Sequence, residues 1–258
     1  MTHRSSWIAI WLVLLPRLTA AQIVNVQGAL AKPPEHDGTT AQLELKIDWR
    51  EGNNSLFDVG GSGTVLVKRG KLLALAIARG EYGRGAGTTF KQKSFEHVRA
   101  RYTLDRRWRW EAFAQHESDR FRRLTVRGVV GTGPALQLVR DDDINLLAGL
   151  AYMLEVERFD DRDGTTDAGA RFRQHRASFY LTGTQRISGT VEVVETVYVQ
   201  PRIDEPSDVR LLGEISITTK LSKHIALTDG FTVAYDRTPP EGIKRFDTQL
   251  RVALLITF

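Results

Sequence analysis

Hydrophobic and polar residues alternate one by one along much of this chain. In residues 41–50, Leu43, Leu45, Ile47 and Trp49 take every second position, and charged or amide side chains lie between them. The same alternation is present in residues 209–221 and 247–258. A period of two over four to eight residues is typical of a β-strand whose two faces meet different surroundings. The chain is therefore predicted to be all-β.

Turn-forming residues divide the chain into about twelve such strands. We place the connections near residues 51–54, 68–71, 83–93, 105–107, 118–123, 140–143, 159–170, 187–189, 201–208, 222–224 and 238–244. From the third onward, long connections alternate with short ones. This indicates an antiparallel transmembrane β-barrel with short periplasmic turns and longer external loops. Ten or fourteen strands are alternatives, because the first hairpins and residues 131–134 are difficult to register. Pro134 predicts a bulge or an interruption there.

A soluble sandwich or a lipocalin-like barrel would show the same period of two. Three features favour lipid around the outer face: the alternating connection lengths, strands long enough to span a membrane, and the aromatic terminal residue Phe258. An even strand count also returns the C-terminus to the side where the barrel begins. Aromatic residues are expected near strand ends, in girdles at the two membrane interfaces; these are Trp49, Trp108, Trp110, Tyr152 and Tyr235.

The first 21 residues have the order of a secretory signal peptide. A short segment with Arg4 precedes nine apolar residues at 7–15, Pro16 and the small residues at 19–21. Nine apolar residues are too few for a membrane-spanning helix, which needs about 20. We therefore divide the chain into a signal peptide (1–21), a periplasmic lead-in without regular structure (22–40) and an outer-membrane β-barrel (41–258). The chain has no cysteine, which excludes disulfides and thiolate chemistry.

Composition changes this picture little. Charged residues make up 26% of the chain and the mean hydropathy is −0.27. A transmembrane barrel has such a composition, because only every second strand residue faces lipid. The net charge of +5 is modest and does not indicate a nucleic-acid partner.

The expected partners are outer-membrane lipids and the barrel-insertion machinery, which would recognise the last strand through Phe258. Lipopolysaccharide is a further candidate for basic residues expected in or near external loops: Lys91, Lys93, Arg120, Arg122 and Arg123.

If the apolar face contacts lipid, the opposite face lines the lumen and carries many charges. The candidate lumen ladder consists of Arg99, Arg101, Glu111, Gln115, Glu117, Arg127, Glu155 and Glu157. Arg176 and Tyr180 continue the wall, and residues 44–50 would meet residues 247–251 where the barrel closes. Two interpretations stay open. The ladder either plugs and rigidifies the barrel, or it lines a narrow channel for small solutes, with Arg99, Arg101 and Glu111 setting the ion preference.

A barrel-embedded hydrolase is a third interpretation. It needs a nucleophile or an activated water, a base and an orienting group. The conceivable sets are His97 with Glu117 and Asp119, or His116 and His175 with Ser178. Solvated or ion-paired histidines are far commoner, so no catalytic residue, cofactor or metal is predicted. Residues 83–89 lack the helix and the Lys-Ser/Thr pair of a phosphate-binding loop, and residues 160–164 lack the closing Glu of a calcium loop.

Several segments resemble one protein family. They are EHVRARY at 96–102, residues 110–124, YVQPR at 198–202, YDRTPPEG at 235–242 and the terminal Phe258. These segments are similar to the domain of unknown function 481 family, whose members are also labelled salt-induced outer-membrane proteins. The resemblance covers residues 27–258, and YVQPR and YDRTPPEG are its most specific parts. It implies an outer-membrane β-barrel of undefined activity, with a structural or envelope-stress role and no catalytic residues to carry over.

Overall fold

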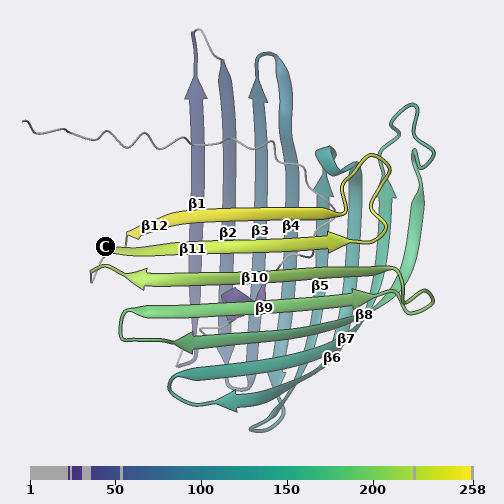
Figure 1. The fold of residues 1–258 in the computed structure, drawn as a ribbon. Coiled ribbons are helices and arrows are strands. Elements are labelled where there is room, and N and C mark those ends of the chain that lie inside the picture. The colour runs from purple at the N-terminus through teal and green to yellow at the C-terminus, as the bar shows by residue number, and fades with distance from the viewer. Residues whose placement is uncertain (1–22, 24, 31–35, 53–54, 223–224, 257–258) are drawn as a thin grey trace, which may run out of the picture.

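A computed structural model describes residues 23, 25–30, 36–52, 55–222 and 225–256 (Figure 1). Twelve antiparallel strands form one sheet, in which each strand pairs with its neighbours in the sequence. The predicted all-β class and strand number are therefore confirmed. The predicted signal peptide and Phe258 lie outside the described residues.

The strands are 11 to 17 residues long, which is enough to span a bilayer when tilted. Their bounds are β1 (Gly38–Arg50), β2 (Leu56–Arg69), β3 (Leu72–Gly85), β4 (Thr88–Thr103), β5 (Trp108–Asp119), β6 (Leu124–Arg140), β7 (Ile144–Phe159), β8 (Arg171–Arg186), β9 (Val191–Pro201), β10 (Val209–Lys220), β11 (Ile225–Asp236) and β12 (Phe246–Ile256). A helix α1 (Gln27–Leu30) precedes β1, and a 3-10 helix η1 (Arg120–Arg122) lies between β5 and β6.

The connections lie at two opposite edges of the sheet. At the edge where β1 begins and β12 ends, they are residues 70–71, 104–107, 141–143, 187–190 and 221–224. We call this the short-turn edge. At the opposite, long-loop edge they are residues 51–55, 86–87, 120–123, 160–170, 202–208 and 237–245. Each connection overlaps its predicted position, because turn chemistry is local in the sequence.

The third connection is much shorter than predicted. Residues 83–93 were expected to form a Gly-rich loop, but only Ala86 and Gly87 separate β3 from β4. Both have positive φ, at 48° and 79°, as a two-residue hairpin turn requires. Gly83 belongs to β3 because its missing side chain leaves room for Phe90. A Cβ there would lie 2.7 Å from the Phe90 ring.

Pro134 interrupts pairing on one side of β6 only. The ladder between β6 and β7 has no pairs at Gly133 and Pro134, although the register is the same before and after them. Proline cannot donate a ladder hydrogen bond. At Gly133 the backbone of β7 comes so close that a Cβ would lie 2.0 Å from the Leu150 carbonyl oxygen. The predicted interruption is therefore present within a continuous strand.

The sheet curves over itself, so that β9–β12 cross in front of β1–β5 (Figure 1). Among the described residues, β1 pairs only with β2 and β12 only with β11. The predicted pairing of the first and last strands is therefore not formed. The inner face of β12 nevertheless approaches the wall formed by β1–β3, since Arg251 lies within electrostatic range of Arg79 on β3, and Arg79 is in register with Glu44 through Ser62.

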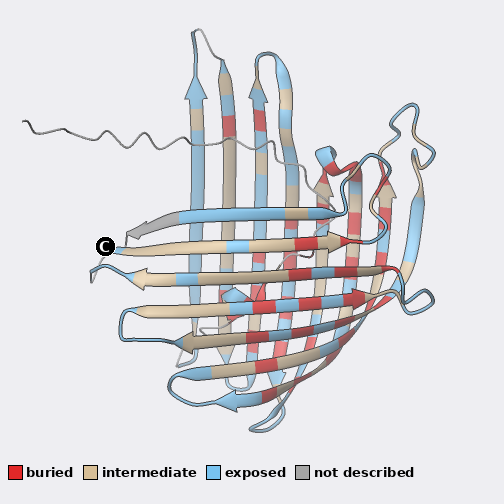
Figure 2. Ribbon diagram, viewed as in Figure 1, coloured by how far each residue is buried: buried red, intermediate tan, exposed pale blue. Residues whose placement is uncertain are grey.

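The outer face of the sheet is apolar and exposed. Leu43, Leu45, Ile47 and Trp49 of β1 are 71–73% exposed. Buried positions recur along β4–β10 on the opposite face, whereas none of the described positions of β1 and β12 is buried (Figure 2). This division follows from the alternation of side chains along a strand. Among the residues that the structure describes, no helix is long and apolar enough to cross a membrane.

Exposed aromatic residues gather near both edges of the sheet. Trp108 and Trp110 lie at the short-turn edge, and Trp49 lies at the long-loop edge. Two ring pairs join the long-loop set, Phe57 with Tyr82 and Tyr235 with Phe246. The position predicted for Tyr152 is wrong, because this residue lies in the middle of β7. Its hydroxyl group bonds to the His175 ring, which gives each of these outer-face polar groups a partner.

An N-terminal segment, residues 23 and 25–30, lies inside the curved sheet. The prediction of an irregular lead-in over 22–40 is wrong for α1, and β1 already begins at Gly38. Val26 and Leu30 pack against the inner faces of β2–β4, in a cluster with Leu66, Leu73, Leu75, Ile77 and Phe95. Ile23 packs against inner-face residues of β6–β11, including Tyr180 and Tyr198. The segment therefore fills the space between two walls of the same sheet.

Candidate functional site

The inner face near the long-loop edge carries a network of buried ion pairs, which we call the central network. Its members are Glu117, Arg122, Arg127, Glu155, Glu157, Arg176, Asp208, Arg210 and Asp236. They come from β5, η1, β6, β7, β8, β10, β11 and the connection before β10. Alternation along each strand turns these side chains inward, while their neighbours in the sequence face outward.

Glu155 is the centre of this network. Its side chain is 0% exposed and accepts hydrogen bonds from three arginines. Arg127 donates from Nε and Nη2 at 2.9 and 2.6 Å, and Arg176 donates from Nε at 3.2 Å. Arg210 donates from Nη1 to both carboxylate oxygens at 2.8 Å. Each oxygen thus has at least two donors, which a buried carboxylate needs in order to remain charged.

Arg210 reaches across the interior of the sheet. It lies on β10, whereas Glu155 and Glu157 lie on β7, and β8 and β9 separate these strands in the sheet. Its Nη2 donates to both Glu157 oxygens at 3.0 and 3.1 Å, and its Nε donates to Asp236 on β11 at 3.0 Å. One guanidinium therefore ties three strands together across the space that a channel would occupy.

Two arginines of the central network extend it outward. Arg122 of η1 pairs with Glu117 at 3.3 Å and with Asp247 of β12 at 3.6 Å. Arg176 pairs with Asp208 at 3.0 Å. These contacts connect the middle of the chain to its last strand near the long-loop edge.

A second buried group, the arginine cluster, lies nearer the short-turn edge. It consists of Arg99, Arg101, Arg109 and Glu111 on β4 and β5. Glu111 accepts from Arg99 at 2.7 Å and from Arg101 at 2.6 Å. Arg101 also donates from Nη2 to Oε1 of Gln27 in the N-terminal segment at 2.7 Å. The cluster is rich in positive charge, since it holds three guanidinium groups and only one carboxylate, which pairs with Arg99 and Arg101.

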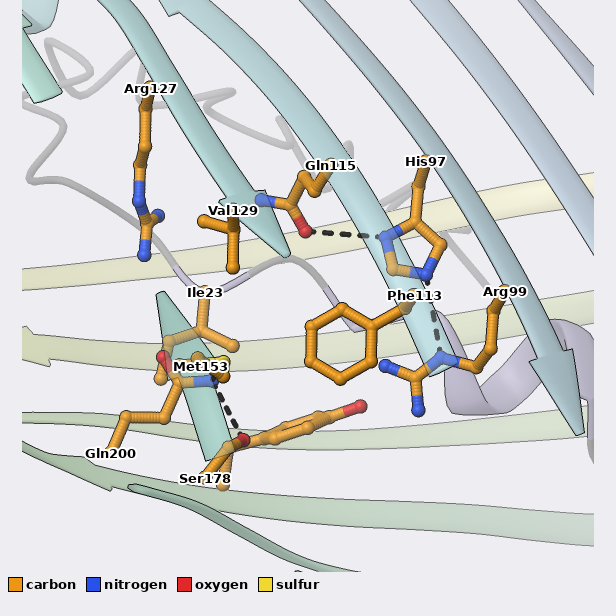
Figure 3. A pocket seen from close by; sticks show the side chains of 11 residues that line it. Ile23, His97, Arg99, Phe113, Gln115, Arg127, Val129, Met153, Ser178 and Gln200 are labelled. Atoms are coloured by element: carbon orange, nitrogen blue, oxygen red, sulfur yellow. Dashed lines mark hydrogen bonds between the residues drawn. The ribbon is translucent and has the colours of Figure 1, made fainter. Parts of the chain in front are cut away.

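A cavity of about 30 Å³ separates the two groups (Figure 3). Arg99 and Arg127 line it from opposite sides, together with Ile23, Gln115 and Tyr198. Its volume has room for one or two water molecules, since about 10–15 Å³ of such space is enough for one. It is far smaller than the pockets of about 300 Å³ or more that hold organic ligands.

At the long-loop edge, Arg123 joins the loop 160–170 to the connection 237–245. Arg123 is fully buried and has a φ of 61°, which lets its side chain enter the loop 160–170. It donates to Asp160 at 2.8 Å, to Asp167 at 2.5 Å and to the Glu241 carbonyl at 3.0 Å. Burial acts to raise the pKa of Asp167, but the Glu241 backbone N–H and the Arg123 guanidinium outweigh it and hold that pKa below its usual value.

All eight predicted ladder residues face inward, and seven of them are buried, whereas Gln115 is half-buried. They do not form one continuous ladder. The structure brings Arg99, Arg101 and Glu111 together in the arginine cluster, and it places the other four charged residues in the central network. Their functional role stays a prediction.

Besides Arg176, which was predicted to continue the wall, four charged members of the central network were not predicted to line the interior. They are Arg122, Asp208, Arg210 and Asp236. Arg210 and Asp236 lie at positions of β10 and β11 that the alternation assigns to the inner face, so the sequence could have predicted their orientation. Asp208 and Arg122 lie in connections, where alternation carries no information.

The conceivable catalytic sets are not assembled in the described part of the chain. His97 contacts Gln115 and Arg99. His116 pairs with Glu96 on the outer face. His175 also faces outward, whereas Ser178 faces inward and accepts from Gln200. Nucleophile and base are therefore on opposite faces of the sheet, which contradicts that arrangement.

The basic residues considered for lipopolysaccharide divide into two groups. Lys91 lies on β4 and pairs inside the sheet with Asp58 and Glu81, and Arg122 and Arg123 are buried in ion pairs. The ion pairs occupy these three side chains, and a contact of the basic residues with lipopolysaccharide stays a prediction. Lys93 and Arg120 remain exposed near the long-loop edge. Within the described ranges, no group of three His, Cys, Asp or Glu residues could hold a metal ion, residues 160–164 included.

Comparison with solved structures supports the fold. The NanC porin covers 84% of this chain and 100% of its own, with 10% sequence identity and a TM-score of 0.50. A bacterial polysaccharide outer-membrane secretin covers 85% of this chain and 80% of its own, with 9% identity and a TM-score of 0.48. The translocator domain of the autotransporter NalP from Neisseria meningitidis covers 87% and 90%, with 13% identity and a TM-score of 0.41. Only the first score is high enough to show a shared fold.

Comparison with protein families is more direct. A search of curated proteins found no match to this sequence. The model of one family, described as "Protein of unknown function, DUF481", matches residues 43–258, which is nearly the whole sheet. The chain therefore belongs to the DUF481 family, in agreement with the resemblance of its YVQPR and YDRTPPEG segments.

Proposed function

We propose that this protein is an outer-membrane β-barrel with a closed interior, acting as a structural component of the envelope. The fold shared with a porin, the exposed apolar outer face and the two aromatic girdles support a membrane location. The first 21 residues support export. The family of unknown function is compatible with this role and assigns no activity.

One observation gives the main support for the proposal that the interior is closed. Glu155 is 0% exposed and binds arginines from β6, β8 and β10, so the inner space at this level is filled by side chains. A solute passing this level would have to separate buried ion pairs. Removing one partner of such a pair costs roughly 3–5 kcal/mol. The N-terminal segment fills the interior nearer the short-turn edge. A narrow channel with Arg99 and Arg101 as its selectivity residues is the second candidate, and it requires both obstacles to move.

Conductance distinguishes the two candidates. The full chain is refolded in detergent, its heat-modifiable migration is checked, and the same sample is inserted into planar bilayers. A closed barrel shows heat-modifiable migration and no steady conductance, for the wild type and for Arg99→Ala alike. Steady wild-type conductance whose ion preference changes in Arg99→Ala would establish the channel. A soluble product without heat-modifiable migration would contradict the membrane location itself.

Membrane insertion is proposed to depend on Phe258. The barrel-insertion machinery would recognise the aromatic end of the last strand. Deletion of Phe258 should impair assembly in the outer membrane and leave export across the inner membrane intact. Fractionation of cells that express the truncated chain tests this, and normal surface assembly would refute the proposal.

A further inference from the structure

Arg109 lacks the partner that every other buried arginine has. Among the described residues it is the one buried arginine for which the structure shows no ion pair, at 8% exposure, and its Nη1 has no hydrogen-bond partner. The nearest charges include two more cations, Arg101 and Arg140. Glu111 is also within range, but it already binds Arg99 and Arg101. A buried guanidinium in this setting lacks a negative charge.

Three further buried polar groups near Arg101 make no hydrogen bond of good geometry, although each lies close to another polar group. They are Nε2 of Gln27 and the hydroxyls of Tyr180 and Tyr198. Tyr180 lies beside Arg101 and Glu111, and Tyr198 lies beside Gln27. The two tyrosine rings are 5.6 Å apart. An amide NH₂ group donates only, whereas a tyrosine hydroxyl can donate or accept. The three guanidinium groups therefore face neutral acceptors and a single carboxylate, Glu111, which Arg99 and Arg101 already bind.

Gln27 occupies the place where a further acceptor would be. Its Oε1 accepts from Arg101 at 2.7 Å, while its Nε2 brings another donor among the donors already present. Val26 and Leu30 on the same segment cover the apolar inner wall of β2–β4. The segment thus places the apolar side chains of Val26 and Leu30 against the apolar part of the wall. Beside them, the neutral Oε1 of Gln27 faces the guanidinium of Arg101.

We propose that the inner face at Arg101 and Arg109 is a binding site for a carboxylate, which the Gln27 amide fills in this structure. A carboxylate has the same shape as the amide, carries a charge and accepts through both oxygens, whereas a guanidinium offers matching paired donors. The adjoining apolar wall selects a small monocarboxylate with an apolar tail. The site faces the interior, so lipid head groups around the barrel do not reach it. The proposal rests on this geometry and not on whether the interior conducts.

Substitution of Gln27 itself is the first test. In Gln27→Glu the added charge should pair with Arg101 and Arg109 and raise the melting temperature of the detergent-refolded full chain by about 2–4 °C, the shift that a gain of about 1 kcal/mol produces in a chain of this size. The gain should vanish when Arg109→Gln is also present. If there is no anion site here, Gln27→Glu should instead lower the melting temperature, because burial of an unpaired carboxylate is costly. A lower melting temperature for Gln27→Glu would overturn the proposal.

Asn25→Asp is the matched control in the same segment. Asn25 donates to Glu214 at 3.1 Å, so an acid there meets an acid and should lower the melting temperature. If both acidic substitutions raise the melting temperature equally, the effect is one of general charge and the carboxylate site is refuted.

Rescue with free anions is the second test. Gln27→Gly removes the amide, and acetate should then raise its melting temperature, with hexanoate acting at lower concentration because its tail covers the apolar wall. Chloride and inorganic phosphate at equal ionic strength are the controls. Equal stabilisation by all four anions, or equal rescue of Gln27→Gly with and without Arg109→Gln, would overturn the proposal. Stabilisation by the two carboxylates alone, dependent on Arg109, would establish it.

Discussion

Replacement of Glu155 by Gln tests whether the central network holds the interior together. The substitution keeps the size and shape of the side chain and removes only its charge. Arg127, Arg176 and Arg210 all donate to this carboxylate at 2.6–3.2 Å, and the Glu155 side chain is 0% exposed. The amide leaves one acceptor oxygen for three guanidinium groups and places an NH₂ donor against them.

The expected loss of stability in Glu155→Gln depends on the ion pairs that the three arginines keep. Breaking a buried ion pair by removing one partner costs roughly 3–5 kcal/mol. Arg127 and Arg210 keep Glu157, and Arg176 keeps Asp208. We therefore expect the lower end, a loss of about 3 kcal/mol in the free energy of unfolding, or about a hundredfold in the folding equilibrium constant.

Urea-dependent refolding into lipid vesicles measures this loss, with heat-modifiable migration and tryptophan fluorescence as parallel signals. Glu205→Gln is the control, because Glu205 pairs with Arg202 at the surface and its side chain is 53% exposed. A surface pair contributes about 0–1 kcal/mol. If the two variants unfold at the same urea concentration, the network does not stabilise the closed interior, and the main support for the proposed function is lost.

Three further perturbations test other parts of the structure. Gly149→Ala should lower the unfolding free energy by about 1–3 kcal/mol in the same urea titration, because a Cβ would lie 2.1 Å from the Tyr180 ring. Cysteines that replace Glu44 and Arg251 should be joined by a bifunctional maleimide in vesicles, since both side chains lie on the inner faces of strands that approach each other. The loop 160–170 should become cleavable by pepsin as the pH falls below about 3.8. Asp167 has a lowered pKa, so its contribution is complete above its unfolded value and is lost as the pH falls through its folded value.

Each of these has a matched control. Gly213→Ala should be neutral within about 0.5 kcal/mol, because nothing lies within 4 Å of its Cβ position. Cysteine at Leu250 replaces an outward side chain next to Arg251, and equally efficient cross-linking to position 44 would contradict the proximity of the inner faces. Asp163→Asn should leave the pepsin profile unchanged, whereas Asp167→Asn should permit cleavage already at pH 4.5. A loop protected equally at pH 4.5 and pH 2.5 would show that Asp167 does not hold it.

Strand number and turn positions could be predicted because both depend on neighbouring residues. Alternation in residues 41–50 determines which side chains of β1 face outward before any strand partner is known. The exception at residues 83–93 has a physical cause. Glycines suggested a loop there, but Gly83 accommodates the Phe90 ring on the neighbouring strand, and only the pairing of β3 with β4 reveals this.

The candidate site was predictable only in part, because some of its contacts join strands that are not neighbours in the sheet. Alternation places Arg127 and Glu155 inward, and strand adjacency makes their contact foreseeable. It cannot show that Arg210 on β10 reaches Glu155 on β7, because that contact depends on the curvature of the sheet. The short helix α1 has too few residues for a helical period, and it is held by contacts with two walls instead. Its place inside the sheet leaves no local signal in the sequence.

The reach of Arg123 has a consequence for how the chain folds. Its bond to the Glu241 carbonyl joins residues 118 positions apart, and the bond from Arg210 to Glu155 spans 55 positions. Contacts of such separation form late, since the ordering of the intervening chain must come first. Until then these arginines and acids are separate and hydrated. The Arg123 contact needs the connection between β11 and β12, so the long-loop edge is complete only once the last hairpin is present.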